Sequence, residues 1–354
     1  MIDLLKYGYI ETEPPPDNQL LGRVTELRRE FYTVITQLGE VTALLKGTFV
    51  YDAVVRTDLP CVGDFVHVQY NESGASQITR VLPRRTMFSR ADFFGHGYAH
   101  VKAVREQILA ANFDYVFIIT SLNNDFNISR ILRYLTQSWQ SGGIPVVILT
   151  KADLVEDFDK QVSEVMQAAP GVAVHAVSAH TGIGLNELDV YLQPCKTLIF
   201  LGMSGVGKSS LVNVLMEKEV MAVKDIREDD SRGRHTTTHR QLFMLPSGAM
   251  IIDTPGMREL GLIGTDDGIS TSFADIEELF SQCRFNNCSH QSEPGCAVKT
   301  AIDNGELDIK RWDNYQKLKR ETLYVENKHE ALRKKSERNK NLAMWSRKRK
   351  NDIL

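Results

Sequence analysis

Short runs of alternating apolar and polar residues fill the first quarter of the chain. Turn residues separate five such runs: GRVTEL (22–27), FYTVIT (31–36), EVTALL (40–45), DFVHVQY (64–70) and ASQITRVL (75–82). In the fourth run Val66 and Val68 alternate with Phe65 and His67, which is the period of a half-buried strand. Five short strands between regularly spaced glycines predict an OB-like β-barrel, a fold that often binds oligonucleotides. A barrel that serves only as a spacer has the same pattern.

From about residue 100 the pattern changes to apolar strands that alternate with helices. The strands are YVFIIT (115–120), PVVILT (145–150), VAVHAVSA (172–179), TLIFLG (197–202) and AMIIDT (249–254). Helical stretches such as ISRILRYLTQSW (128–139) and SSLVNVLMEK (209–218) lie between them. Buried strands that alternate with helices predict a parallel, doubly wound sheet. After Gly264 the strand signal ends, and helical segments flank a group of cysteines.

The expected architecture is therefore multidomain α/β. We predict an N-terminal OB-fold RNA-binding domain over residues 1–86, an α/β domain over 87–264, and a helical region with the cysteine cluster over 265–354. A length of 354 residues with 42% hydrophobic and 25% charged residues suits a soluble chain of more than one domain. No apolar run is long enough for a membrane span, and the N-terminal residues do not form a signal sequence, so we expect a cytoplasmic protein without membrane contact.

Charge is unevenly distributed along the chain. The formal net charge is −3, yet residues 310–354 hold 15 Lys and Arg against 6 Asp and Glu. A basic end suggests a polyanion such as nucleic acid as its partner, although a solvated helix end has the same composition. In the same region apolar residues recur every three positions, which places them on one side of a helix: Ile309, Trp312, Tyr315 and Leu318. This pattern favours packing of the aromatic side chains against the cysteine region over stacking on bases.

The strongest chemical motif is GMSGVGKSS (202–210), which matches the phosphate-loop pattern G-x-x-x-x-G-K-[ST]. It follows an apolar strand and opens a helix, so backbone N–H groups and the helix dipole can hold phosphate oxygens. We expect Lys208 to bridge the β- and γ-phosphates and Ser209 to ligate Mg²⁺. The expected phosphate-binding residues are Gly202, Met203, Ser204, Gly205, Val206, Gly207, Lys208, Ser209 and Ser210.

Two further strings at strand ends are typical of guanine recognition. In TKAD (150–153) the carboxylate of Asp153 can accept hydrogen bonds from guanine N1–H and N2–H₂, which adenine cannot supply. Lys151 would lie along the base and ribose, next to Thr150 and Ala152. The string SAHTG (178–182) would direct the N–H of Ala179, which follows Ser178, towards guanine O6.

Other residues are candidates for Mg²⁺ binding and hydrolysis. In DTPG (253–256), Asp253 would hold Mg²⁺ through its second shell or a water, and the Gly256 N–H could meet the γ-phosphate. Within RGRHTTTH (232–239), Thr237 is the preferred Mg²⁺ ligand and Thr238 the alternative, unless the segment is an ordinary polar loop.

Hydrolysis needs a water held in line with the γ-phosphate, and the residue after DTPG cannot hold a water in position. Met257 stands where Ras-like proteins have a Gln, and a thioether cannot orient a water. His235 is the nearest polar candidate for catalysis and His239 the second. An exposed histidine without a role is an equal alternative for either.

The segment CRFNNCSHQSEPGC (283–296) suits a metal ion. Three thiolates and one imidazole within 14 residues fit tetrahedral Zn²⁺ in a closed structural site. The expected ligands are Cys283, Cys288, His290 and Cys296.

The base-reading strings precede the phosphate loop, which is the reverse of the order in most GTPases and requires a circularly permuted sheet. This order, together with GMSGVGKSS, HTTTH, DTPGMRE and the Cys/His cluster, resembles the small-ribosomal-subunit-dependent GTPase A (RsgA) family over nearly the whole chain. Many members have Asn at the position of Thr150, so the missing amide implies weaker guanine affinity.

The resemblance implies an OB-fold domain, a circularly permuted P-loop GTPase domain and a zinc-binding domain that dock on the small ribosomal subunit and its rRNA. It also implies Mg²⁺-dependent conversion of GTP to GDP, stimulated by that subunit during late assembly. We expect a monomer. Two alternatives stay open: a nucleotide-regulated RNA-binding module in which hydrolysis is incidental, and an ATP-dependent P-loop kinase or transferase, against which TKAD and SAHTG argue.

Overall fold

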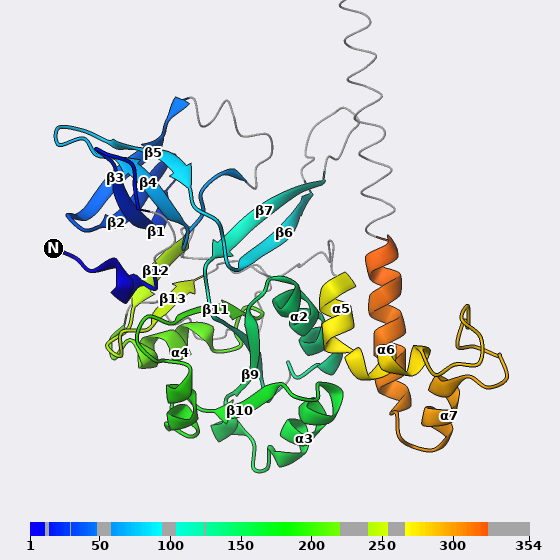
Figure 1. Ribbon diagram of the computed structural model, residues 1–354. Coiled ribbons are helices and arrows are strands. Elements are labelled where there is room, and N and C mark those ends of the chain that lie inside the picture. The colour runs from blue at the N-terminus through cyan, green and yellow to red at the C-terminus, as the bar shows by residue number, and fades with distance from the viewer. Residues whose placement is uncertain are drawn as a thin grey trace, which may run out of the picture.

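The strands and helices expected from the hydropathy pattern form three successive regions in the computed structural model (Figure 1). The structure describes residues 1–10, 14–28, 30–47, 58–93, 104–123, 125–219, 240–253 and 266–324. A β-barrel, an α/β sheet and a helical region follow one another along the chain, which confirms the expected fold class.

Five strands close into a barrel after a short 3₁₀ helix, η1 (Leu4–Tyr7). The strands are β1 (Leu20–Arg28), β2 (Phe31–Thr36), β3 (Gly39–Leu45), β4 (Phe65–Gln69) and β5 (Ser76–Val81). β1 pairs with both β2 and β4, and β5 pairs with both β3 and β4, so the sheet closes. Buried apolar residues from all five strands, including Val24, Val34 and Val66, fill the interior. The barrel expected from the alternating pattern is confirmed.

The half-buried pattern expected for β4 is wrong, because both faces of this strand are covered. Its valines face the barrel interior, but His67 is only 1% exposed and Phe65 only 6%. The guanidinium of Arg23 lies 5.1 Å from the centre of the Phe65 ring, and the ring of Tyr9 lies 5.3 Å from it. At Phe65, the outer face of the barrel is therefore an internal contact of the molecule.

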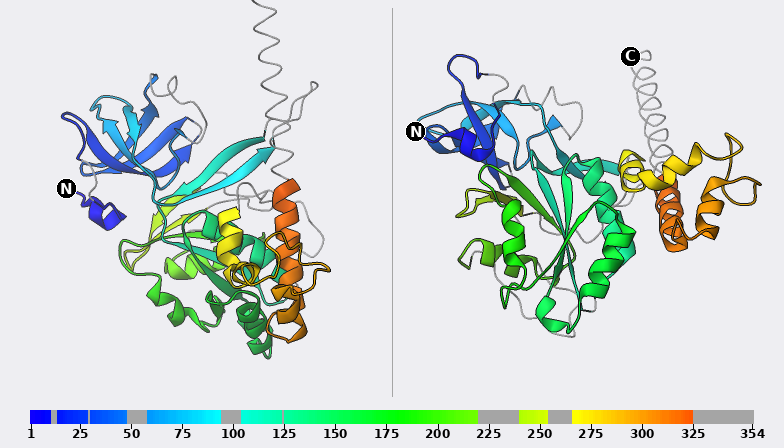
Figure 2. Two further views of the ribbon diagram at one scale, coloured as in Figure 1. Left: turned by 45° about the vertical axis from the view of Figure 1, so that its right-hand side comes forward. Right: turned by 60° about the horizontal axis from the view of Figure 1, so that its bottom comes forward.

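A two-stranded hairpin, which the sequence pattern did not reveal, connects the barrel to the α/β sheet. β6 (Met87–Phe93) and β7 (Val104–Ala111) pair in antiparallel fashion and extend from the body of the molecule (Figures 1 and 2). Phe88 and Leu109 at the base of the hairpin are buried in the same apolar cluster as the α/β sheet. The base of the hairpin is thus part of the core.

The middle of the chain forms a sheet with the strand order β10-β9-β8-β11-β13-β12. Its strands are β8 (Tyr115–Ser121), β9 (Ile144–Thr150), β10 (Ala173–Val177), β11 (Thr197–Leu201), β12 (Arg240–Met244) and β13 (Met250–Asp253). All neighbours are parallel except β12 and β13. The chain first builds outward from β8 to β10 and then adds β11 and β13 on the other side of β8, which makes the sheet doubly wound.

Helices cover both faces of this sheet (Figure 2). They are α2 (Ile128–Gln140), α3 (Asp159–Ala168), α4 (Lys208–Leu215) and the 3₁₀ helix η4 (Leu185–Val190). Neighbouring residues of one strand enter different cores: Ile118 packs in the cluster that contains Leu132 of α2, and Phe117 packs in the cluster that contains Leu211 of α4. Because both faces are buried, the strands have continuous apolar sequences.

The C-terminal region consists of the helices α5 (Asp266–Ser272), α6 (Ala274–Phe280), α7 (Ala297–Asp303) and the helical residues 309–324. Of these, α5 and the last helix contact α2. Trp312, Tyr315 and Leu318 are buried, which confirms the expected packing of the aromatic side. Ile309 was expected on the same side but is 51% exposed, because it stands in the first turn of its helix.

Arg311 links this last helix to neighbouring helices. The side chain is 7% exposed, and its guanidinium donates to both carboxylate oxygens of Asp275 at 2.9 and 2.5 Å. It also donates to the carbonyl oxygens of Ser272 and Ala168, the second of which ends α3. One side chain therefore joins four helical segments: its own, α3, α5 and α6.

In the part of the chain that the structure describes, no helix combines the length and apolar character that crossing a membrane requires.

Candidate functional site

The expected nucleotide motifs meet at one edge of the sheet. Thr150 at the end of β9 pairs with Val177 at the end of β10 and with Ser121 at the end of β8. The phosphate loop leaves β11, the next strand beyond β8. The direction of chain growth reverses between β8 and β11, and in such sheets ligands bind at this point, beyond the carboxyl ends of the strands.

The phosphate loop is a tight turn between β11 and α4. Gly202 has φ +155°, and a Cβ at this position would lie 2.3 Å from the carbonyl oxygen of Ile119, so only glycine fits. Val206 is 1% exposed and fixes the loop to the core, while Ser204 and Gly205 at its tip are exposed. The geometry presents backbone N–H groups and the start of α4 to an anion.

Lys208 is directed towards the loop that it follows. Its Nζ donates to the carbonyl oxygens of Gly202 and Met203. Ser209 and Ser210 occupy the next positions in the first turn of α4 and are half-buried. The lysine and the hydroxyl expected to contact phosphate and Mg²⁺ are therefore at the same end of one helix.

A hydrogen bond joins the base-reading string to the phosphate loop. The Oγ1 of Thr150, which is 4% exposed, donates to the carbonyl oxygen of Val206 at 2.5 Å. A Cβ on Gly207 would lie 3.5 Å from the Oγ1 of Thr150, which shows how closely the two segments approach. The threonine hydroxyl thus positions the phosphate loop, a role that sequence reasoning missed because it considered Thr150 only as a contact of the base.

The residues after Thr150 turn sharply away from β9. Lys151 adopts a left-handed conformation with φ +61°, which is uncommon for a side chain of this kind and marks a constrained site. Ala152 is 2% exposed and anchors the 3₁₀ helix η3 (Ala152–Leu154), whereas Asp153 is exposed at the sheet edge. The carboxylate expected to select guanine is therefore accessible to a ligand.

The loop after β10 is ordered by its own hydrogen bonds. Ser178 is fully buried, and its Oγ accepts from the backbone N–H groups of His180 and Thr181 at 3.2 and 3.1 Å. The Ser178 N–H donates to the carbonyl oxygen of Ile183 at 2.9 Å. These bonds hold Ala179 in place at the tip of the loop, one strand away from Thr150.

Asp253 ends β13, next to the phosphate-loop strand. The side chain is 9% exposed, and burial raises the pKa of Asp253 to about 6, while the positive charge of Lys208 lowers that pKa. The charge of Lys208 is thus felt at Asp253, as expected of two groups that share a Mg²⁺–phosphate site.

Several expected site residues lie outside the described residues. They are Thr237 and its alternative Thr238, His235 and its alternative His239, and Gly256 with Met257. Their roles in Mg²⁺ binding and hydrolysis stay predictions.

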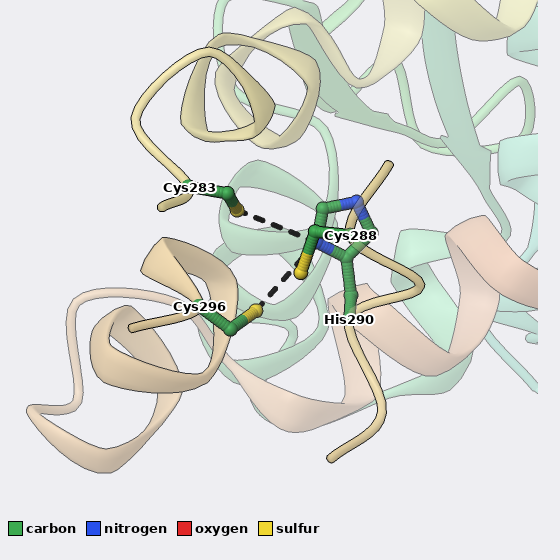
Figure 3. Close-up of side chains that lie close together, drawn as sticks. All are labelled: Cys283, Cys288, His290 and Cys296. Carbon is green, nitrogen blue, oxygen red and sulfur yellow. Dashed lines mark hydrogen bonds between the residues drawn. The ribbon is translucent and has the colours of Figure 1, made fainter. Parts of the chain in front are cut away.

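The four expected metal ligands converge in the C-terminal region (Figure 3). One ligand atom from each of Cys283, Cys288, His290 and Cys296 lies within 4.8 Å of all the others. The Nδ1 of His290 is 3.6 Å from the Sγ atoms of both Cys283 and Cys296. A tetrahedral zinc ion separates a ligating nitrogen and sulfur by about 3.5 Å. The cluster can therefore hold a metal ion, and its donors and spacing fit zinc.

Aromatic and acidic neighbours support this cluster. Phe280 stacks on the His290 ring with 4.3 Å between ring centres, and burial lowers the pKa of His290, which favours the neutral ring that binds metals. Glu293 accepts hydrogen bonds from the N–H and hydroxyl groups of Ser289 and from two further backbone N–H groups. Sequence reasoning missed Glu293, whose only signal was a carboxylate inside the cysteine-rich loop.

Comparisons with known proteins agree with this geometry. The model of a family described as RsgA GTPase matches residues 81–263. The chain is 45% identical over 340 residues to small ribosomal subunit biogenesis GTPase RsgA 1 of Listeria innocua, covering 95% of this chain and 94% of the relative. It is 46% identical over 322 residues to RsgA 2 of Listeria monocytogenes, covering 90% and 88%.

Solved structures share the fold. The crystal structure of YjeQ from Thermotoga maritima superimposes with a TM-score of 0.63 at 27% identity, covering 86% of this chain and 99% of that one. The structure of YloQ, described as a circularly permuted GTPase, gives a TM-score of 0.60 at 24% identity, covering 85% and 94%. The inverted motif order therefore corresponds to a known permuted fold.

Proposed function

This chain belongs to the RsgA GTPase family, and on that premise we propose that it hydrolyses GTP on the small ribosomal subunit during late assembly of that subunit. The observation that carries the proposal is the hydrogen bond from Thr150 to Val206, which joins the base-reading string to the phosphate loop. Guanine nucleotide binding requires a base-selecting carboxylate and a phosphate-binding loop at one edge of a sheet, and this bond supports such an arrangement.

Each motif has a distinct task in the proposed site. Asp153 accepts from guanine N1–H and N2–H₂, and the Ala179 N–H faces O6. The backbone of the phosphate loop and Lys208 hold the phosphates. Mg²⁺ would be held by the hydroxyls of Ser209 and Thr237, with Asp253 contacting it through a water.

Hydrolysis transfers the γ-phosphoryl group to water. The water oxygen attacks the γ-phosphorus, the bond from that phosphorus to the β–γ bridging oxygen breaks, and GDP and inorganic phosphate leave. His235 would orient the water, because Met257 cannot, and the Gly256 N–H would contact the γ-phosphate. Turnover by the free protein should therefore be slow, and the subunit should raise it.

The proposed task of the cysteine cluster is to hold one structural zinc ion. Thiolate and imidazole donors favour zinc over magnesium or calcium, and the 3.6 Å contacts of His290 support tetrahedral geometry. Metal analysis of the purified protein should find about one zinc per chain, and Cys296→Ser should lose most of it. Full metal content in C296S contradicts the assignment, and Cys61→Ser, which changes a buried cysteine outside the cluster, is the matched control.

The proposed contact with the subunit is through RNA. We divide the chain into an OB-fold domain over residues 1–86, a GTPase domain over 87–264 and a zinc-binding domain over 265–354. The barrel and the basic segment 310–354 would bind rRNA phosphates, and the protein would act as a monomer in the cytoplasm. RNA binding of this kind should weaken steeply as the salt concentration rises.

The decisive experiment is steady-state GTP turnover with purified small subunits, with large subunits and with neither. We expect that small subunits raise turnover by tenfold or more and that large subunits do not. This is on the order of what an additional group that orients the water supplies. Lys208→Ala should abolish it. Equal turnover in all three conditions contradicts the proposal, and subunit release that needs GTP but not hydrolysis favours the RNA-binding alternative.

Base selection is tested separately with Asp153→Asn. This change replaces one acceptor with a donor, so GTP affinity should fall and xanthosine triphosphate affinity should rise. ATP affinity should stay low in both proteins. Unchanged preference for GTP in D153N contradicts the assignment of Asp153.

A further inference from the structure

Strand β1 belongs to the barrel and to the GTPase sheet at the same time. It pairs with β2 and β4 in the barrel, and its last residues pair with β12, where Glu26 is opposite Gln241 and Leu27 is opposite Arg240. Leu27 packs against both the barrel core and the core that contains α2. The outer edge of β12, which in an isolated domain would be open to another strand, is therefore filled by the barrel.

The same pairing places a barrel residue in line with Asp253. Gln241 is opposite Glu26 on one side and opposite Asp253 on the other, so the three residues form one row across three strands. Directly opposite residues present their side chains on the same face, and strands are about 4.8 Å apart. Glu26 is thus about 10 Å from the Asp253 backbone. Both carboxylates are largely buried, at 7% and 9% exposed.

The row continues across the outer face of the barrel wall. Thr33 of β2 is opposite Glu26, and the exposed Thr42 of β3 is opposite Thr33. A line of polar residues therefore runs from the outside of the barrel to the end of β13.

A second attachment lies three residues earlier on β1. The side chain of Arg23 is fully buried, and it donates to the carbonyl oxygens of Gly63, Tyr7 and Asn112 at 3.2, 2.6 and 2.8 Å. It also donates at 3.0 Å to the Oγ1 of Thr197, the first residue of the phosphate-loop strand. Burial lowers the pKa of Arg23 to about 9, so the side chain is still charged at neutral pH.

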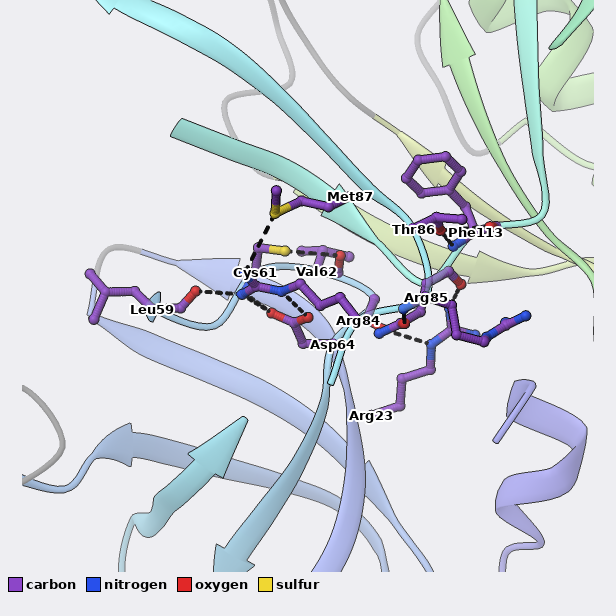
Figure 4. A network of polar contacts seen from close by, with 12 residues as sticks. Arg23, Leu59, Cys61, Val62, Asp64, Arg84, Arg85, Thr86, Met87 and Phe113 are labelled. Carbon is purple, nitrogen blue, oxygen red and sulfur yellow. Dashed lines mark hydrogen bonds and ion pairs between the residues drawn. The ribbon is translucent and has the colours of Figure 1, made fainter. Parts of the chain in front are cut away.

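The connection between barrel and sheet is held by similar bonds (Figure 4). Arg84 forms two 2.7 Å contacts with the carboxylate of Asp64, which is fully buried. The next residue, Arg85, donates its N–H to the side-chain oxygen of Asn112 at 2.9 Å. A rotation of the barrel about this connection would break buried hydrogen bonds, so displacements of β1 pass to β12 and β13 instead.

We propose that β1 couples the barrel to the Mg²⁺–phosphate end of the site, with Glu26 and Gln241 as positioning residues for Asp253. A ligand on the barrel, such as the rRNA of the proposed function on which this inference rests, then changes the affinity for Mg²⁺–GTP. By linkage, Mg²⁺–GTP must change the affinity of the barrel for that ligand by the same factor. Because the coupling runs through β1, the effect of the nucleotide on this strand can be measured without the ribosome.

The test is hydrogen exchange of the full chain with Mg²⁺ alone and with Mg²⁺ plus a non-hydrolysable GTP analogue. Amides of residues 24–28 should exchange about fivefold more slowly when the nucleotide is bound, a factor at the lower end of ordinary allosteric coupling. Amides of residues 76–81 on β5, which lies away from β12 in the strand order, should not change.

The matched variants are Gln241→Gly, which loosens the middle strand of the row, and Gln77→Gly, which makes the same change on β5. Q241G should lose most of the nucleotide effect on β1 and need several-fold more Mg²⁺ for nucleotide binding, with affinity in excess EDTA unchanged. Q77G should behave as the wild type. A loss of affinity that is equal with and without Mg²⁺ indicates a merely structural role and contradicts the proposal.

Glu26→Ala tests the same row from the barrel side if Q241G does not fold. If the wild type binds the nucleotide but hydrogen exchange at β1 does not change, the coupling is overturned and the proposed function is not. A wild-type chain that binds no guanine nucleotide overturns the proposed function instead.

Discussion

Asp253, which we propose to contact Mg²⁺ through a water, lies in an unfavourable environment. Burial raises the pKa of Asp253 to about 6 from its ordinary value of 3.8. Between these two values the folded chain binds more protons than the unfolded chain, so the free energy of unfolding falls as the pH rises through this window. The positive charge of Lys208 only partly offsets this cost. The proposed Mg²⁺ contact is therefore a source of instability when no cation is bound.

Replacing Asp253 with asparagine should stabilise the protein in the absence of Mg²⁺ and nucleotide. We expect the free energy of unfolding at pH 7.5 to rise by about 3 kcal/mol, since the pKa of Asp253 is raised from 3.8 to about 6 and one pKa unit corresponds to about 1.4 kcal/mol. At pH 4 the wild type and D253N should be equally stable. Urea unfolding at both pH values measures the difference in stability between the two proteins, and the same difference at both pH values contradicts the assigned cause.

Thr150 should matter for nucleotide affinity through the phosphate loop. Thr150→Val keeps the shape but removes the hydroxyl that donates to Val206, so the loop loses one hydrogen bond of about 1 kcal/mol. GTP affinity should fall about fivefold in a fluorescence titration. Thr150→Ser keeps the hydroxyl and should bind like the wild type, and tight binding by T150V shows that the bond is dispensable.

Single residues differ in how far the sequence predicts them. Lys208 and Asp153 follow from local strings, because their strand ends are set by neighbouring residues. The four candidate metal ligands follow in the same way from their spacing within one loop. The partner of Thr150 and the raised pKa of Asp253 depend on contacts between segments far apart in sequence, which no local pattern contains.

At the scale of elements, the last helix depends on one buried guanidinium. Arg311 donates to Asp275 and to backbone oxygens of two other segments, and its charge has little access to water. Removing it leaves the carbonyl oxygens of Ser272 and Ala168 and the half-exposed carboxylate of Asp275 without this donor.

Arg311→Met should lower the free energy of unfolding by about 2–3 kcal/mol. Amides of residues 309–324 should also exchange faster. Lys319→Met is the matched control, because Lys319 contacts Asp266 and Glu277 at 3.3 and 3.5 Å on a more exposed surface. The control should lose less than about 1 kcal/mol. Equal losses in the two variants contradict a special role for Arg311.

The elements that the sequence pattern missed share a physical cause. Strands β6 and β7 have the sequences MFSRADF and VREQILAA, which neither alternate strictly nor form a continuous apolar run, so their strand signal is weak. Strand β12 is five residues long and begins with Arg240 and Gln241. The strands buried on both faces were predicted, because burial on both faces requires a continuous apolar run.

At the scale of the whole molecule, the barrel completes the GTPase sheet. Without β1 the edge of β12 would expose unpaired backbone groups, and Arg23 would no longer bond to Thr197. The fold class follows from the sequence, but this shared strand does not, because period and composition say nothing about which edge of a sheet accepts another domain.

Deletion of residues 1–81 should therefore produce a chain that associates. We expect dimers or larger species in size-exclusion chromatography and a lower unfolding temperature than the full chain, since an open sheet edge pairs with other chains. A truncated chain that elutes as a monomer with the stability of the full protein shows that β12 does not need its neighbour.

The buried arginine also sets an order of events during synthesis. The barrel is made first, yet Arg23 finds its hydroxyl partner 174 residues later and the sulfur of Met250 227 residues later. At about 5–20 residues per second the ribosome needs ten seconds or more to deliver these partners. Throughout that interval a nascent barrel carries a desolvated cation without its full set of acceptors, so the barrel should mature only when the sheet behind it has been translated.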